Sequence, residues 1–316
     1  MAATARFANR ARPISRPNPG VAALFVKDGR VLARGWTREG GRPHAEADAL
    51  SRLPEGGAAG STLYVTLEPC AHKSNRGPAC SDIISAAGPA RVVIGQRDPD
   101  PRTAGKGIKK LKASGIEVIL LEDEESHRSV AGFLTRQVEG RPHVTLKLAQ
   151  SLDGCIALAD GTSQWITGEE ARAHCHAMRA RHDAILVGGG TWRADKPKLD
   201  VRLPGLADRS PDRVLLSRGV APDDVRVINT PEQITDLDDV LHLYVEGGAA
   251  TAASFLARDL VDELHIYQAP ILIGEGLSSL DAIGLTDLEE AHGRWKQSEA
   301  RPLGSDRFSA YRRTRK

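Results

Sequence analysis

The sequence predicts an α/β protein with two domains. Its 316 residues are enough for about two domains, and 41% of them are hydrophobic, which is enough to fill two cores. Short apolar segments typical of strands alternate with segments typical of helices, the pattern of a layered α/β domain. Gly140-Arg141-Pro142 interrupts this alternation. We therefore expect one domain at 1–140 and a second at 141–316.

The composition excludes several classes of protein. A net charge of +2 with 4% aromatic residues argues against a nucleic-acid groove or a membrane surface. No stretch approaches the ~18 apolar residues of a membrane span. The first sixteen residues carry Arg6, Arg10 and Arg12 without the apolar run of a secretory signal. Four cysteines are too few for a disulfide scaffold. We expect a cytoplasmic homo-oligomer that acts on a small molecule.

The first half opens with an Ala-rich helix over 2–10, which the prolines that follow it bring to an end. Asp28-Gly29 predicts a hairpin turn between two strands. Gly40-Gly41-Arg42-Pro43 opens a helix at His44, which Pro54 closes. The other expected elements alternate along the chain: strands at 21–26, 31–36, 62–67, 91–95 and 116–121, and helices at 81–87, 108–114 and 124–138.

A candidate zinc site lies in this half. His44, Cys70 and Cys80 supply three ligands suited to Zn²⁺, which leaves a fourth tetrahedral position for water. Glu46 is not needed as a ligand and can move protons for that water. The pattern resembles the H-x-E…P-C-x-x-C signature of zinc deaminases, although nine residues separate Cys70 from Cys80 instead of two.

Two other readings of these residues remain open. Histidine and cysteine are often ordinary core residues, and a structural zinc site uses the same residue types. A structural site requires four protein ligands, and His72 is the only obvious candidate for the fourth. Cys155 and Cys175 stand apart from the motif and are expected to be core or surface residues.

The second half continues the alternation of strands and helices. Two of its strands run into glycines, at Gly188-Gly189-Gly190 and Gly247-Gly248, where backbone amides can meet a phosphate or simply form a tight turn. Neither is a G-x-G-x-x-G fingerprint, so a Rossmann fold is not supported. The expected strands are 144–149, 184–187, 214–217, 241–245, 261–267 with a continuation at 269–274, and 308–312; helices follow 168 and cover 251–259.

Motifs in order along both halves resemble one family, the bifunctional riboflavin-biosynthesis deaminase/reductases. In the first half these are Pro17-Asn18-Pro19, His44-Ala45-Glu46, the segment 66–72 (T-L-E-P-C-A-H) with Cys80, and the segments 98–101 and 104–107. In the second half they are the segments 147–154, 163–167, 190–195, 199–202 and 246–248. The resemblance covers nearly the whole chain in the domain order of the family.

The resemblance implies a cytidine-deaminase-like three-layer domain followed by a dihydrofolate-reductase-like domain. The first would deaminate 2,5-diamino-6-(5-phosphoribosylamino)pyrimidin-4-one with Zn²⁺, Glu46 transferring protons and Asn18 binding the ring. The second would use NADPH to reduce the ribosyl group to a ribityl chain. The implied NADPH contacts are Ala149, Trp165, Thr191, Asp195, Ser217 and Gly248. The implied substrate contacts are Ser163, Arg179, Leu199, Arg202 and Glu246, with the two arginines suited to a phosphate.

The chain departs from the family pattern at Lys196, Asp200 and Ser217. These departures favour an alternative in which the second half is a non-catalytic oligomerisation scaffold. Two further hypotheses are a nucleic-acid-editing deaminase, which the low charge and aromatic content argue against, and a zinc-stabilised structural module, which would leave every activity independent of Glu46.

Overall fold

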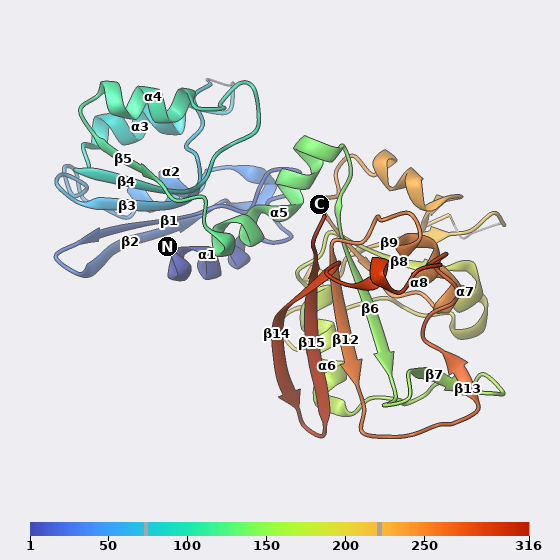
Figure 1. Ribbon diagram of the computed structural model, residues 1–316. Helices are drawn as coiled ribbons and strands as arrows, with labels where there is room; N and C mark the ends of the chain where they lie inside the picture. The colour runs from blue at the N-terminus through green and yellow to red at the C-terminus, as the bar shows by residue number, and fades with distance from the viewer. Residues whose placement is uncertain (73–74, 220–222, 316) are drawn as a thin grey trace. The chain divides into compact units, whose positions relative to one another are not determined.

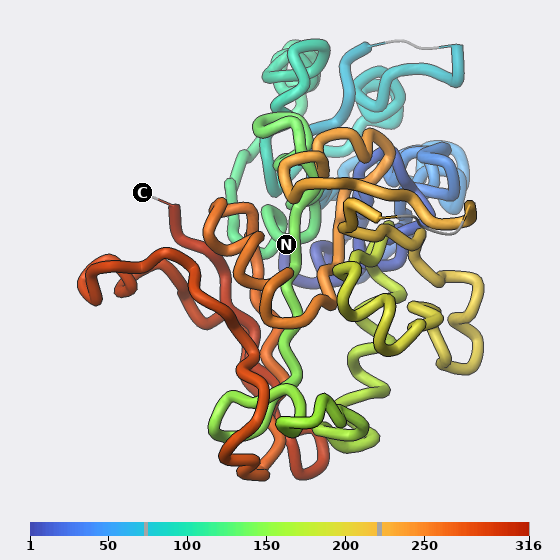
Figure 2. The backbone as a smooth tube through the Cα atoms, turned by 90° about the vertical axis from the view of Figure 1, so that its right-hand side faces the viewer, coloured from blue at the N-terminus to red at the C-terminus, as the bar shows by residue number. Residues whose placement is uncertain are grey.

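The chain passes from its first unit to its second directly after helix α5 (Glu124–Glu139), which ends at Gly140 in a left-handed conformation. The computed structural model describes residues 1–72, 75–219 and 223–315. It divides into the units Met1–Arg141 and Pro142–Lys316 (Figure 1). Figure 2 follows the backbone from its blue amino-terminal segments to its red carboxyl-terminal strands.

The first unit is built on a five-stranded sheet of order β2-β1-β3-β4-β5. β1 is antiparallel to β2 and β3, whereas β3, β4 and β5 are parallel. Asp28 and Gly29 form the turn between the first two strands, both with positive φ, as a tight hairpin requires. The strands are β1 (Ala22–Lys27), β2 (Arg30–Trp36), β3 (Thr62–Leu67), β4 (Arg91–Gln96) and β5 (Glu117–Leu120).

Helices cover both faces of this sheet and make three layers (Figure 1). Three helices that contact one another lie on one face: α2 (Ala45–Leu50), α3 (Cys80–Ala87) and α4 (Lys106–Ala113). Helix α1 (Ala2–Ala8) packs with α5 on the other face. The short helix Asn9–Ala11 extends α1. The expected elements of this half are all present, with ends that differ by at most three residues.

The second unit contains an eight-stranded mixed sheet of order β10-β9-β8-β11-β6-β12-β15-β14. The six strands from β10 to β12 are parallel, and β15 and β14 are antiparallel additions at one edge. The strands are β6 (His143–Gln150), β8 (Ala184–Gly188), β9 (Asp212–Leu216), β10 (Arg226–Ile228), β11 (His242–Val245), β12 (Glu263–Gln268), β14 (Trp295–Leu303) and β15 (Asp306–Arg313). Strands β7 (Cys155–Leu158) and β13 (Gly276–Ser278) form a separate pair.

Alternate residues of these strands fill two cores, because successive strand side chains point to opposite faces. Leu186 belongs to the core that includes Phe255 of helix α8 (Ala249–Leu256). Its neighbour Ile185 belongs to the opposite core, which includes Met178 of helix α6 (Glu169–Arg179). Helix α7 (Gly189–Asp195) follows β8 without a break.

The sequence prediction was wrong at the continuation of β12. Ala269–Gly274 forms no strand: the backbone amides of Ile273 and Gly274 donate to the Asp153 carboxylate, and Leu272 is 75% exposed. Four strands were not anticipated, namely β7, β10, β13 and β14. Within the described part of the chain, no helix is long and apolar enough to cross a membrane.

Candidate active sites in the two units

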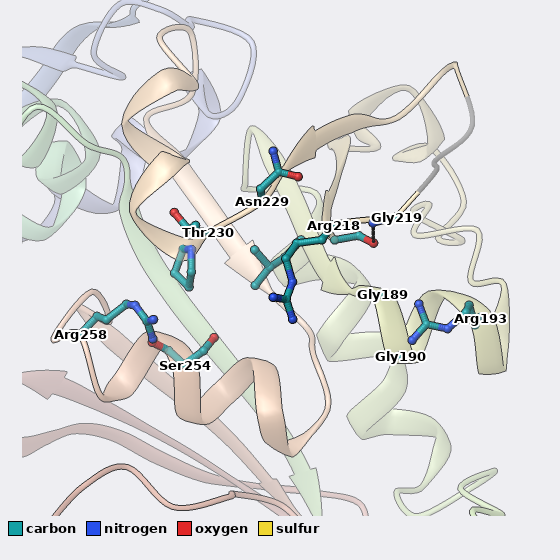
Figure 3. Close-up of a pocket in the computed structure, with 12 residues that line it drawn as sticks. Gly189, Gly190, Arg193, Arg218, Gly219, Asn229, Thr230, Ser254 and Arg258 are labelled. Atoms are coloured by element: carbon teal, nitrogen blue, oxygen red, sulfur yellow. Dashed lines mark hydrogen bonds between the residues drawn. The ribbon is translucent and has the colours of Figure 1, made fainter.

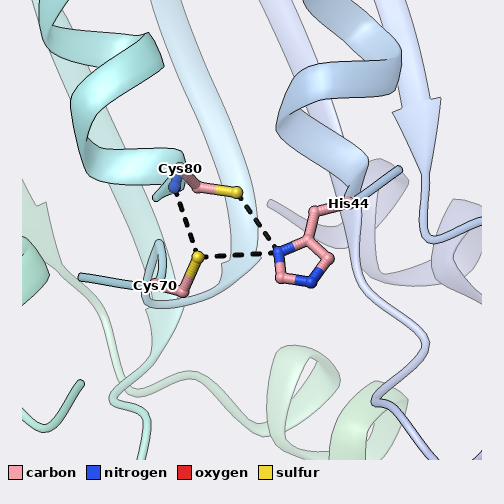
Figure 4. A group of neighbouring side chains, drawn as sticks. All are labelled: His44, Cys70 and Cys80. Atoms are coloured by element: carbon pink, nitrogen blue, oxygen red, sulfur yellow. Dashed lines mark hydrogen bonds between the residues drawn. The ribbon is translucent and has the colours of Figure 1, made fainter. Parts of the chain in front are cut away.

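The three candidate metal ligands come together in the first unit (Figure 4). His44 is the N-cap residue of α2, Cys70 lies three residues beyond β3, and Cys80 is the first residue of α3. Their ligand atoms all lie within 4.8 Å of one another. The starts of two helices and the end of one strand therefore bring three side chains from distant segments into one cluster.

The donor set fits a tetrahedral zinc ion. His44 Nδ1 lies 3.3 Å from Cys80 Sγ and 3.6 Å from Cys70 Sγ. The usual Zn–N and Zn–S bond lengths put tetrahedral ligand atoms about 3.6 Å apart. His72 is not a member of this cluster, so the described residues do not supply the four protein ligands of a structural site.

Local hydrogen bonds prepare one thiol for metal binding. The Cys80 side chain and the His44 ring lower the pKa of Cys70 to about 4, helped by the Cys80 amide, which donates to Cys70 Sγ at 3.2 Å. The Cys80 pKa is raised, because Cys70 and burial disfavour a second thiolate in the same place. Two neighbouring thiolates repel each other, and a cation between the two sulfur atoms would offset this repulsion. This is the electrostatic reason for such a pair of cysteines to bind a metal.

Glu46 lies in the first turn of α2, two residues after His44, and is only 3% exposed. Burial raises its pKa, an effect that the charge of His44 partly offsets. A carboxyl group that is buried beside the ligands, and is not needed as one of them, is placed to accept and release a proton during a reaction there.

Glu46, His44 and Cys70 line a cavity of about 230 Å³, and the predicted ring-binding residue Asn18 lines it too. Gly41 supports Asn18 from behind: a Cβ at this glycine, whose φ is +86°, would overlap the Asn18 side chain. The structure thus brings together the predicted metal, proton-transfer and ring-binding residues of the first unit.

The same cavity is also lined by residues for which no role was expected from the sequence, among them Asp98, Asp100 and Arg102. Burial raises the pKa of Asp98 to about 6, whereas hydrogen bonds from Arg102 hold the pKa of Asp100 below its usual value. The two aspartates lie in the segment 98–101 that carried the family resemblance. Their place in this segment was the one signal in the sequence that the two aspartates could belong to the site.

The loop between Cys70 and Cys80 is the longest departure from the generic deaminase signature. Residues 73–74 lie outside the described part of the chain. Arg76 donates to the Gly40 carbonyl at 2.8 Å, and Arg42 donates to the Pro78 carbonyl at 3.5 Å. The described end of the loop is therefore tied to the segment that precedes His44.

In the second unit, four of the predicted NADPH contacts lie at one edge of the parallel sheet. Ala149 is next to last in β6, and Gly248, Thr191 and Ser217 follow the carboxyl ends of β11, β8 and β9. Gly248 and Thr191 are close neighbours, since a Cβ at Gly248 would lie 3.6 Å from the Thr191 hydroxyl. Ligands of α/β sheets bind at this edge, so the positions suit a cofactor.

Three other predicted residues lie on connections beside this edge. Ser163 and Trp165 occupy the segment before α6, where Trp165 is 63% exposed and the Arg172 guanidinium stacks 4.7 Å from its ring centre. Asp195 ends α7. Among the described residues, no hydrogen bond or ion pair joins these three to the strand-end residues.

Glu246 and Arg179 form a buried ion pair, although 67 residues separate them. Arg179 donates from Nε to Oε1 at 2.6 Å and from Nη2 to Oε2 at 2.8 Å. Burial alone would raise the pKa of Glu246, but the Arg179 charge outweighs it and lowers the pKa to about 2. Cys175 donates to the same carboxylate at 3.7 Å, and Lys147 Nζ lies 3.9 Å away.

The remaining predicted substrate residues lie after α7. Leu199 is buried, and the carbonyl oxygen of Asp200 accepts a hydrogen bond from Arg179 at 3.1 Å. The Arg202 side chain is 59% exposed and lies 3.5 Å from the Asp200 carboxylate. Arg202 thus presents a guanidinium to solvent, whereas Arg179 is committed to Glu246.

The glycines after β8 and β11 have a packing role that the sequence did not reveal. A Cβ at Gly188 or at Gly247 would overlap the Thr251 side chain of α8. These two glycines allow α8 to approach the sheet. Gly190, in contrast, has nothing within 4 Å of its Cβ position and faces open space.

Each unit matches a known protein family. Residues 1–96 match the family model of the cytidine and deoxycytidylate deaminase zinc-binding region. Residues 142–307 match that of the RibD C-terminal domain. Together with the fold, these matches define a class of two-domain enzymes in which a cytidine-deaminase-like domain that binds zinc precedes a RibD C-terminal domain.

Whole-chain relatives share this organisation. The chain is 36% identical to the riboflavin biosynthesis protein RibD of Escherichia coli and 35% identical to that of Aquifex aeolicus, in each case over 97% of this chain and 96% of the relative. A solved Thermotoga maritima structure, described as a diaminohydroxyphosphoribosylaminopyrimidine deaminase/5-amino-6-(5-phosphoribosylamino)uracil reductase, superposes with a TM-score of 0.87 at 33% identity, covering 99% and 97% of the two chains. The chain belongs to the RibD family of bifunctional riboflavin-biosynthesis enzymes.

Proposed function

We propose that the first unit deaminates 2,5-diamino-6-(5-phosphoribosylamino)pyrimidin-4-one and that the second reduces the ribosyl group of the product with NADPH. The observation that carries the proposal is the cavity of about 230 Å³ that Glu46 and Asn18 line together with His44 and Cys70, two members of the three-ligand cluster. Three protein ligands and a free carboxyl group suit hydrolysis better than structural metal binding.

In the first unit, His44, Cys70 and Cys80 would hold Zn²⁺, which supplies an activated water when bound. Glu46 takes a proton from that water as its oxygen attacks the amine-bearing ring carbon. Glu46 gives that proton to the ring nitrogen, takes a second proton from the hydroxyl group now bonded to the ring carbon, and gives it to the leaving amine. The carbonyl group then forms, the C–N bond breaks and ammonia departs. Asn18, held from behind by Gly41, offers one donor and one acceptor to the edge of the ring.

In the second unit, NADPH would supply hydride to C1′ of the sugar. The bond between C1′ and the ring oxygen breaks, and that oxygen takes a proton, which gives the open ribityl chain. We assign the cofactor to Ala149, Trp165, Thr191, Asp195, Ser217 and Gly248. We assign the substrate to Ser163, Leu199, Arg202 and the Arg179–Glu246 pair. The exposed Arg202 guanidinium is best suited to the substrate phosphate, because Glu246 already occupies the Arg179 fork.

The test is incubation of the full chain with the diaminopyrimidine substrate and NADPH. Ammonia release and NADPH absorbance are followed separately, and one equivalent of each change is expected per substrate. Ammonia release without NADPH oxidation would favour the alternative in which the second unit is a scaffold. No ammonia release from the zinc-loaded protein would contradict the deaminase assignment.

We also propose that the enzyme works in the cytoplasm as a homo-oligomer. In each main sheet the outer strands β2 and β14 have a strand partner on only one side within the described residues, which leaves edges to which a second copy can add. Sedimentation equilibrium of the purified chain measures the assembly. A monomer at micromolar concentration would contradict this part of the proposal.

A further inference from the structure

A cavity in the first unit has no part in the proposed function. The cavity of about 640 Å³ in the second unit is lined by Ser217 and so belongs with the proposed cofactor contacts (Figure 3). A separate cavity of about 440 Å³ is lined by residues of α1, of β2 and of the segment after α2. It shares no lining residue with the cavity that holds Glu46. Its volume is within the about 300–1,000 Å³ typical of ligand sites.

This edge cavity, so called because β2 is the outer strand of its sheet, combines apolar and cationic walls. The rings of Phe7 and Trp36 meet edge to face, with their centres 5.3 Å apart. The aliphatic segment 31–33 lies beside them, and its first two residues are 43% and 40% exposed. The other lining residues are Arg10, Arg34 and Arg52, and none of the residues that line the cavity is acidic.

Guanidinium groups gather around the Trp36 ring. The guanidinium carbon of Arg38 lies 3.6 Å from the ring centre, and those of Arg10 and Arg52 each lie 5.5 Å from it. The arginines come from the short helix Asn9–Ala11, from the residues after β2 and from those after α2, so they meet only in the fold. Cations over an aromatic ring are attracted by its π electrons, which holds these groups beside the cavity.

Positive charge at the edge cavity exceeds the negative charge that could balance it. Arg38 and Arg52 share one carboxylate, that of Asp48. Among residues 1–72, 75–219 and 223–315, no ion pair or hydrogen bond engages the guanidinium group of Arg10 or Arg34. Four guanidinium groups therefore face a single carboxylate, in a chain whose net charge is only +2. An anion in the cavity would offset the repulsion among them.

We infer that the edge cavity binds a ligand of mononucleotide size, a phosphate ester that carries a flat heteroaromatic ring. Arginine holds a phosphate through two parallel hydrogen bonds, and Arg10 and Arg34 are available for this. The ring of the ligand would stack on the accessible part of the half-buried Trp36. The low net charge argues against a longer nucleic acid on this surface. Flavin and purine mononucleotides share this chemistry, and the probes below distinguish them.

Calorimetric titration of the full chain tests the inference with five probes. Flavin mononucleotide (FMN) and GMP carry both a ring and a phosphate. Riboflavin and guanosine carry only the ring, and inorganic phosphate carries only the anion. We expect FMN or GMP to bind at least about tenfold more tightly than its phosphate-free counterpart and than inorganic phosphate. The mononucleotide that binds more tightly identifies the class of ring.

Arg34→Ala should weaken binding of that mononucleotide by about 10- to 100-fold, the loss expected for a charge-assisted hydrogen bond. The affinity for the phosphate-free counterpart should change by less than about twofold. Arg34→Lys, which keeps the charge and loses the fork, should fall between wild type and Arg34→Ala. Trp36→Leu should weaken the mononucleotide and its phosphate-free counterpart alike, by about tenfold, because both lose the stacking surface.

Arg30→Ala is the matched control, since it removes an exposed arginine of the same strand that does not line the cavity. Its probe affinities should equal those of the wild type. Equal affinities of wild type and Arg34→Ala for the mononucleotide would overturn the inference. So would a wild type that binds neither FMN nor GMP, or that binds riboflavin and guanosine as tightly as their phosphate esters. If a second copy of the chain covers the cavity, no mononucleotide binds and Arg34→Ala alters sedimentation, which overturns it as well.

Discussion

Glu46 is the residue on which the proposed deamination depends most directly. Glu46→Gln keeps the size of the side chain but removes its ability to transfer a proton. We expect ammonia release to fall by about 10²- to 10⁴-fold, the usual contribution of a general acid–base group. Zinc content should stay at one ion per chain, because Glu46 is not a member of the ligand cluster. Ammonia assay and metal analysis on the same preparation check both statements.

The matched control for Glu46 is Glu55→Gln, which changes an exposed carboxylate in the loop after α2. It should leave ammonia release, zinc content and NADPH oxidation unchanged. If Glu46→Gln deaminated the substrate at the wild-type rate, the proton-transfer role would be wrong, and the zinc-stabilised structural module would regain support.

Glu246 is expected to matter for stability as well as for substrate binding. Glu246→Gln leaves the Arg179 charge buried with no compensating carboxylate. Breaking a buried pair in this way costs about 3–5 kcal/mol of unfolding free energy. Urea unfolding followed by tryptophan fluorescence is a suitable measurement, because three of the four tryptophans, Trp165, Trp192 and Trp295, lie in the second unit.

The same pair predicts a definite pH dependence. The Glu246 pKa is about 2 in the folded chain and about 4.3 in an unfolded one. A lowered pKa stabilises the fold above the unfolded value, and this contribution is lost as the pH falls from about 4.3 towards 2. The stability difference between wild type and Glu246→Gln should therefore be constant from pH 5 to 8. A difference that already shrinks between pH 8 and 6 would contradict the assignment.

At the scale of single residues, a site could be predicted from the sequence where its chemistry accepts only a few residue types. His44, Cys70 and Cys80 could be grouped from the sequence because zinc accepts few kinds of ligand. The commitment of Arg179 to Glu246 could not be predicted, because residue type alone does not say which of several cations a buried carboxylate will meet across 67 positions. It emerges only when α6 packs across the end of β11.

At the scale of elements, Glu68 joins the Cys70 segment to helix α4. This buried carboxylate accepts hydrogen bonds from the Gly105 amide at 3.0 Å and the Ile108 amide at 3.1 Å. These are free amides at the start of the helix, which a carboxylate satisfies well. Gly107 makes the approach possible, since a Cβ there would overlap the Pro69 carbonyl oxygen.

Glu68→Ala should therefore weaken both the fold and the metal site. We expect a loss of about 1–3 kcal/mol in unfolding free energy, because buried amides lose their acceptor. Zinc should also be released at a lower chelator concentration, since the segment that carries Cys70 is no longer anchored to α4. Glu117→Gln is the control, because it removes only an exposed ion pair with Arg91 and should cost less than about 0.5 kcal/mol. Unchanged chelator sensitivity in Glu68→Ala would contradict the coupling.

Elements with a clear apolar pattern could be predicted, and those without one could not. β3 (Thr62–Leu67) was placed at its observed ends, because all six of its residues are hydrophobic or β-branched and buried or half-buried. β14 (Trp295–Leu303) was missed, because this edge strand is mostly polar and five of its nine residues are exposed. At Ala269–Gly274 an apolar pattern was present without a neighbouring strand to pair with, and Asp153 took the free amides.

At the scale of the whole molecule, the two activities should be separable by removing the metal. The candidate ligands all lie within Met1–Arg141, and the proposed cofactor contacts all lie within Pro142–Lys316. Treatment with a zinc chelator should abolish ammonia release from the diaminopyrimidine. NADPH oxidation should continue at the untreated rate when the deaminated intermediate is supplied. Added Zn²⁺ should restore ammonia release, and loss of both activities on chelation would show that the second unit depends on the metal.

The arrangement of the second unit's sheet also bears on how such an enzyme can change over evolutionary time. Residues proposed to meet the cofactor follow the ends of β8, β9 and β11, whereas the strands themselves fill the two cores. A residue inserted within a strand would turn every later side chain of that strand to the opposite face. A substitution or a length change just beyond a strand end leaves the cores untouched. Residues at such positions, Ser217 among them, can therefore be replaced over evolutionary time without loss of stability.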